Sequence, residues 1–125
     1  MNGDVISLSV PARPDYILAV RLAVSAVAER IGFDIEDIED LKVASAEACI
    51  LLLAAGAEMI DLRMAVCDGL SLDFMAAGER SCGADEKDSD GLSQYLLDAL
   101  VDTCDFRCEG GTVTAVLLKK SLSSR

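Results

Sequence analysis

The dipeptide Asp68-Gly69 lies between two apolar runs, and it limits the possible folds more than any other feature of this sequence. The runs extend from Met59 to Cys67 and from Leu70 to Ala76. Asp-Gly between apolar runs is a strong short-range signal for a β-hairpin, because tight two-residue turns favour these residues. The sequence therefore predicts two antiparallel strands in the middle of the chain.

Further strand patterns lie at both ends of the sequence. Apolar and polar residues alternate from Val5 to Val10, which is typical of a half-buried strand. Near the C-terminus, Gly110-Gly111 separates a run from Cys104 to Cys108 from one between Thr112 and Leu118. These patterns predict a first strand and a second, C-terminal hairpin.

A first helix is predicted from Asp15, as the N-cap, to about Arg30, with Gly32 as its C-terminal stop. One face of this helix carries an apolar stripe at helical spacing, formed by Ile17, Val20, Val24, Val27 and Ile31. Leu18 and Leu22 make a second face apolar as well. The protein's own core needs only one apolar stripe on this helix. The additional apolar face therefore predicts contact with a second copy of the chain, and hence a homodimer.

A second helix is predicted to start at Asp34, with Asp37 in a capping arrangement, and to end at Gly56. Acidic residues crowd its N-terminal end, where the helix dipole favours negative charge. Its inward stripe is predicted to be Ile38, Leu41, Ser45, Ala48, Leu52 and Ala55. After the central hairpin, a Gly-, Ser- and acid-rich loop from Gly78 to Gly91 and a short helix from Leu92 to Val101 are expected.

The predicted order of elements is βααββαββ, without a linker or an internal repeat. This order favours an α/β (α+β) two-layer sandwich, in which helices cover one face of a mainly antiparallel sheet. A chain of 125 residues with 52% hydrophobic residues is large enough for one packed domain, so residues 1–125 are expected to form a single domain.

The charge of the chain limits its partners. It has 22 acidic and 11 basic residues, a formal net charge of −11. Nucleic acids and anionic membranes bind through lysine and arginine, so neither is an expected partner. A protein surface with basic groups is the natural electrostatic complement.

No secretory signal precedes the first strand pattern, and the longest apolar run, from Ala48 to Ala57, is about half of a membrane span. A cytoplasmic location is therefore expected. The five cysteines, which lack C-x-x-C spacing, are expected to be free thiols, mostly buried. They are Cys49, Cys67, Cys82, Cys104 and Cys108. With no histidine in the chain, no metal site is expected.

Four short stretches in order carry a resemblance to a known family. They are Val10 to Tyr16, Val20-Arg21-Leu22, Ile38 to Lys42, and Glu47-Ala48-Cys49. Together they resemble the bacterial anti-sigma factor serine-protein kinases, which are GHKL (Bergerat-fold, histidine-kinase-like) ATPases. The similarity covers nearly the whole chain and is strongest over residues 5–50. It implies binding of a sigma factor, Mg-ATP-dependent phosphorylation of an anti-anti-sigma (STAS-type) protein, and homodimers.

The resemblance also implies three nucleotide-binding motifs, and each departs from the family pattern here. In E-A-x-x-N the glutamate is the general base and the asparagine holds Mg²⁺. Glu47 matches the base, but Leu51 stands in place of the asparagine. In D-x-G the aspartate accepts a hydrogen bond from adenine, and here Ala76 replaces it while Gly78 is kept.

The third motif is a G-x-G at the start of the last helix, which here becomes Gly91 followed by Ser93. Three losses together predict that the pocket holds no nucleotide and that no cofactor is bound. The run from Ile50 to Leu53 is expected to fill the former pocket with hydrocarbon. Glu47 is then expected to be a vestigial base, either facing solvent or hydrogen-bonded by backbone.

The sequence leaves three functions open. The first is an anti-sigma-like regulator that needs no nucleotide, and the second is an active ATP-dependent serine-protein kinase whose site tolerates the changes. The third is a subunit that pairs with an intact kinase relative. In the resembling kinases an arginine at the position of Arg21 contacts the protein partner. The alternative for Arg21 is structural, with its stem along Leu18 and Leu22 and its head in water.

Overall fold

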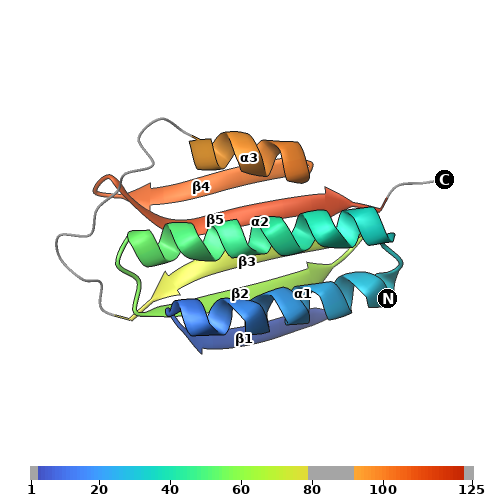
Figure 1. Ribbon diagram of the computed structural model, residues 1–125, viewed down its shortest axis with the longest axis horizontal. Helices are drawn as coiled ribbons and strands as arrows, with labels where there is room; N and C mark the ends of the chain where they lie inside the picture. The colour runs from blue at the N-terminus through green and yellow to red at the C-terminus, as the bar shows by residue number, and fades with distance from the viewer. Residues whose placement is uncertain (1–2, 79–91, 123–125) are drawn as a thin grey trace.

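The computed structural model describes residues 3–78 and 92–122, which form five strands, three α-helices and one short 3₁₀ helix (Figure 1). The strands are β1 (Val5–Pro11), β2 (Met59–Val66), β3 (Gly69–Ala77), β4 (Thr103–Glu109) and β5 (Thr112–Ser121). The helices are η1 (Pro14–Tyr16), α1 (Ile17–Ile31), α2 (Ile35–Ala54) and α3 (Leu92–Leu100). The predicted loop beyond Gly78, with Cys82 and Gly91, lies outside the described residues.

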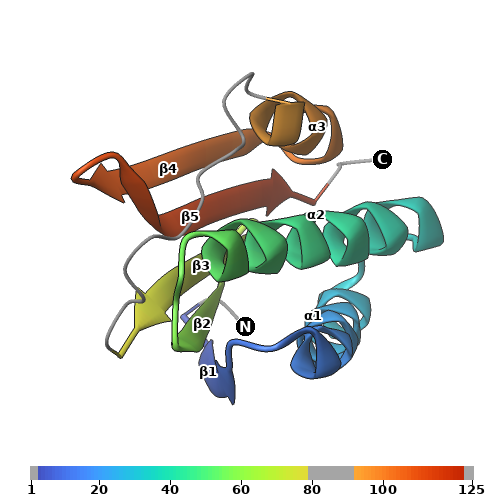
Figure 2. The ribbon, with the colours of Figure 1, turned by 60° about the vertical axis from the view of Figure 1, so that its left-hand side comes forward.

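The strands form one sheet in the order β1-β2-β3-β5-β4, and every neighbouring pair is antiparallel. All three α-helices lie on the same face of the sheet, with α2 between α1 and α3 (Figure 2). The predicted element order and the two-layer α/β fold are therefore confirmed.

The core lies between the sheet and α2. The side chains of α2 that face the sheet are buried, namely Leu41, Ala44, Ser45, Ala48, Cys49, Leu51 and Leu52. Opposite them, alternate residues of the central strands are buried, among them Ile60, Leu62, Met64, Leu72, Phe74, Val116 and Leu118. The strand alternation and the helical stripe predicted from the sequence thus meet in one hydrophobic cluster.

Both predicted hairpins are present, but their glycines serve different purposes. Gly110 and Gly111 have φ values of 59° and 79°, as a two-residue type I′ turn requires. Gly69 has no positive φ. Instead, a Cβ atom at Gly69 would lie 2.1 Å from the carbonyl oxygen of Lys120, because β5 approaches closely there. The central hairpin was therefore predicted correctly. Gly69 is required there because a side chain would clash with β5, and not because the turn needs a positive φ.

The helix ends follow the sequence signals in part. Gly32, with φ of 107°, ends α1, and the Asp34 side chain caps α2 by accepting from the backbone N–H of Asp37 at 2.9 Å. The prediction of Asp15 as an N-cap is wrong. Asp15 lies inside η1, which begins at Pro14, because proline pre-sets the helical φ and starts the helical turn one residue before the aspartate.

Among the helices of the described residues, none is long and apolar enough to cross a membrane.

We predict that Gly69→Ala lowers the free energy of unfolding by about 2–3 kcal/mol, because the new methyl group must displace the backbone of β5. Ser71→Ala, on the same strand, serves as the control and is expected to stay within about 0.5 kcal/mol of wild type. Urea denaturation measures both values. A Gly69→Ala protein as stable as Ser71→Ala would contradict the close approach of the two strands.

Candidate functional site

Two of the predicted site residues, Glu47 and Ser93, are in direct contact. Glu47 is half-buried on the C-terminal half of α2, and Ser93 is the second residue of α3. The Ser93 hydroxyl donates a hydrogen bond to Glu47 Oε2 at 2.7 Å. The expectation that Glu47 faces solvent or accepts from backbone is therefore wrong. The distance between α3 and α2 does not follow from the sequence, so this side-chain partner was not predicted.

Leu51 lies one helical turn after Glu47 and packs into the core, with only 7% of its surface exposed. Leu52 is fully buried beside it, whereas Ile50 is 49% exposed. Leu51 and Leu52 are therefore core residues, whereas Ile50 is largely exposed. That these residues fill a former nucleotide pocket stays a prediction. The side chain of Leu51 has no oxygen atom to coordinate a cation.

Ala76 and Gly78 lie at the end of β3. Ala76 pairs with Ile60 and packs against the core, and its methyl side chain accepts no hydrogen bond. Gly78 has φ of 82°, and a Cβ atom there would lie 2.6 Å from Glu58 Oε1. Glycine is thus required at position 78 for two reasons: its positive φ is unfavourable for other residues, and a side chain would clash with Glu58. Glu58 is a carboxylate of this region that sequence reasoning missed, since no motif includes it.

Gly91, the remaining predicted pocket residue, lies outside the described residues. Among the described residues of the predicted pocket, Glu47 is acidic and Leu51 and Ala76 are apolar, and Glu58 lies beside Gly78. None of these side chains carries a positive charge that could pair with a triphosphate. Within residues 3–78 and 92–122, no group of three or more metal-binding side chains is present.

Cys49 follows Glu47 by two residues and lies on the buried side of α2. Burial raises the pKa of its thiol to about 12. The thiol therefore stays protonated at neutral pH, so Cys49 acts as a small apolar core residue and not as a nucleophile.

Arg21 lies in the N-terminal half of α1. Its Nε atom is buried and has no hydrogen-bond partner among the described residues. The neighbouring side chains Leu18 and Leu22 are 57% and 56% exposed. The second apolar face of α1 predicted from the sequence is therefore present, with an unsatisfied donor beside it. A buried donor without an acceptor is unfavourable.

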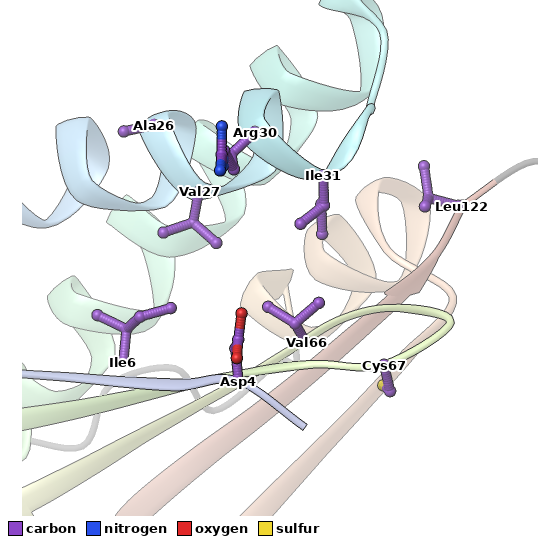
Figure 3. A pocket seen from close by; sticks show the side chains of 9 residues that line it. All are labelled: Asp4, Ile6, Ala26, Val27, Arg30, Ile31, Val66, Cys67 and Leu122. Atoms are coloured by element: carbon purple, nitrogen blue, oxygen red, sulfur yellow. The ribbon is translucent and has the colours of Figure 1, made fainter. Parts of the chain in front are cut away.

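A hollow of about 750 Å³ lies elsewhere, between the C-terminal half of α1 and the edge of the sheet (Figure 3). Val27 and Ile31 point into it from α1, and Ile6 and Val66 point toward them from the strands. None of the predicted site residues lines this hollow. Val66 pairs at the opposite end of β2 and β3 from Ala76, so the hollow and the predicted nucleotide pocket are separate.

The fold and these residues place the chain in a defined class. The chain belongs to the histidine kinase-like ATPase domain family, whose model matches residues 10–119. Among its relatives, the serine-protein kinase RsbW of Bacillus subtilis is 31% identical over 92% of this chain and 85% of the relative. The serine-protein kinase RsbW of Bacillus velezensis is also 31% identical, over 90% and 84% of the two chains.

A solved structure supports the fold. The crystal structure of the RsbU and RsbW domains of a Mycobacterium tuberculosis protein superposes with a TM-score of 0.72 at 20% identity. The match covers 98% of this chain and 33% of that longer chain.

We predict that Leu51→Asn, which introduces the family's metal-binding side chain, lowers the free energy of unfolding by about 3 kcal/mol. The substitution removes core hydrocarbon and buries an amide. Ile50→Asn, one position earlier and half-exposed, is the matched control and is expected to change stability by less than about 1 kcal/mol. Thermal and urea unfolding compare the two variants, and equal losses would contradict the packing of Leu51 in the core.

Proposed function

We propose that this chain is an anti-sigma-factor-like regulator that binds a sigma factor or an anti-anti-sigma (STAS-type) protein without nucleotide chemistry. The observation that carries the proposal is the burial of Leu51 in the core, one turn after Glu47. The family uses this position to hold the metal of Mg-ATP, and here it is part of the hydrophobic cluster. A protein that regulates transcription in this way would act in the cytoplasm.

The loss of nucleotide binding is supported by three separate positions. Leu51 offers no metal ligand and Ala76 no acceptor for adenine, and Ser93 stands where the family has a glycine. The Ser93 hydroxyl already donates a hydrogen bond to the carboxylate of Glu47, which is the group that would act as the general base. In the family these three positions contact the metal, adenine and the phosphates, so no single compensating change would restore all three contacts.

Retention of protein binding is supported by the exposed face of α1. This face carries the exposed Leu18 and Leu22, and Arg21, whose side chain is partly exposed, lies beside them on α1. Exposed leucines provide apolar contact area, and an arginine pairs well with a carboxylate of a partner. We propose that Arg21 contacts the regulatory partner and that the leucines also contribute to a homodimer.

An active serine-protein kinase is the second candidate. Glu47 is retained at the position of the general base, and the relatives are named serine-protein kinases. In such an enzyme Glu47 would accept the proton of a substrate serine on a carboxylate whose Oε2 already accepts from Ser93. Nucleotide binding separates the two candidates.

We predict that millimolar Mg-ATP or Mg-ADP leaves the melting temperature of the protein unchanged. A ligand present at 100 times its Kd would stabilise the protein by about 2.7 kcal/mol, which shifts the melting temperature by several degrees. Isothermal titration calorimetry provides the independent measurement. Micromolar affinity for either nucleotide would support the kinase and overturn the proposal.

We predict that Arg21→Glu weakens binding to the cognate sigma factor or anti-anti-sigma protein at least tenfold, about 1.4 kcal/mol. The physical reason is the replacement of a donor by a carboxylate at the centre of the exposed apolar face. Arg30→Glu, on another part of α1, changes the net charge equally and is the matched control. If a folded Arg21→Glu protein binds with unchanged affinity, Arg21 has a structural role and does not contact the partner.

A further inference from the structure

Helix α3 is short, and of its side chains at positions 93–100 one is fully buried. Of its nine residues, Leu97 is fully buried, whereas Tyr95 and Leu96 are 77% and 38% exposed. Helices of this length are not stable by themselves in water, so α3 depends on contacts with the rest of the protein. Figure 2 shows α3 beside α2, on the same face of the sheet.

The first contact that holds α3 lies at its N-terminal end. The Ser93 hydroxyl donates to Glu47 Oε2 at 2.7 Å in a partly buried position. Hydrogen bonds to a charged acceptor are stronger than those between neutral groups, and partial burial reduces competition from water. This contact joins the first turn of α3 to the C-terminal half of α2.

The second contact lies at the C-terminal end of α3 and uses Lys120 of β5, a residue that no sequence motif indicated. Lys120 Nζ donates to the carbonyl oxygen of Leu100 at 2.8 Å. The same ammonium group lies 3.7 Å from Asp37 Oδ1 and 4.0 Å from Asp40 Oδ2, both on α2. A cation at a helix C-terminus is favourable because it interacts with the free carbonyl groups there.

The two contacts have matching positions along the two helices. Leu100 follows Ser93 by seven residues, and Glu47 follows Asp40 by seven residues. Seven residues are about two helical turns, so each pair lies on one face of its helix, about 10 Å apart. Since Ser93 meets Glu47 while Leu100 is joined to Asp40 through Lys120, α3 runs antiparallel to α2.

We propose that the Ser93–Glu47 hydrogen bond and the Lys120 bridge together hold α3 in one fixed position on α2 without any ligand. Ser93, Glu47 and Lys120 are positioning residues in this arrangement. The N-terminal contact uses the carboxylate of the predicted nucleotide site, and in that respect the inference rests on the function proposed above. The consequence is a protein whose α3 surface, with Tyr95 exposed, is present permanently and not assembled by nucleotide.

Hydrogen exchange of wild type and variants, followed by mass spectrometry, tests this inference. Ser93→Ala is expected to increase amide exchange in α3 about tenfold, while amides of β2 and β3 keep their wild-type rates. Ser93→Thr keeps the hydroxyl and is expected to exchange like wild type. Ser25→Ala is a second control, because within the described part of the chain the Ser25 hydroxyl donates to the carbonyl oxygen of Leu22 in its own helix.

The C-terminal contact has its own pair of variants. Lys120→Met keeps the length of the side chain but removes the ammonium group, and it is expected to increase exchange at the C-terminal end of α3. Lys120→Arg keeps a cation and is expected to restore most of the protection. In Ser93→Ala combined with Glu47→Ala, the effect is expected to equal that of Ser93→Ala alone, because both changes remove the same bond.

The outcomes distinguish this inference from the proposed function. Unchanged exchange of α3 in both Ser93→Ala and Lys120→Met would overturn it. An equal increase in α3, β2 and β3 would also overturn it, since the contacts would then support the whole fold and not the position of α3. Nucleotide binding by the wild-type protein, measured separately, would overturn the proposed function. It would not decide whether the two contacts hold α3, which the hydrogen-exchange result tests independently.

Discussion

The packing of α2 against the centre of the antiparallel sheet is the interaction on which the rest of the structure depends. Because α2 lies between α1 and α3, its buried face contacts the sheet while its two flanks contact the other helices (Figure 2). Leu41, Ala48 and Leu52 are fully buried on that face. Alanine at positions such as Ala44 and Ala48 lets the helix approach the strands closely. Burial of this apolar surface is the main source of stability in a domain of this size.

The same helix also carries two of the residues on which the proposed function rests. Glu47 and Leu51 are one turn apart, yet Leu51 faces the core and Glu47 faces α3. Leu51 therefore adds hydrocarbon to the core at the position where the resembling kinases have an asparagine. This packing supports the proposed regulator without nucleotide chemistry.

Protein binding and the position of α3 depend on different surfaces from those of the core. The exposed leucines of α1 and the buried Nε of Arg21 are unfavourable in an isolated monomer, which is the usual property of a surface that meets a partner. On the other side of α2, Lys120 is placed on the core face of β5, where a lysine requires compensation by acceptors. The acceptors come from α2 and from the C-terminal end of α3. The same contacts that compensate the charge of Lys120 therefore also hold α3 beside α2.

The sequence by itself determined the elements, because their periodicity and turn residues are local properties. Alternation predicted the strands, Gly110-Gly111 predicted its turn, and the 3.6-residue stripe of α2 predicted its buried face. The motif changes at Leu51, Ala76 and Ser93 were equally visible in the chain. Only the tertiary structure decided that Ser93 bonds to Glu47, that Lys120 bridges three elements, and that Gly69 is needed for space. The physical reason is that these contacts join residues far apart in sequence, and their distances depend on how helices and strands pack rather than on local preference.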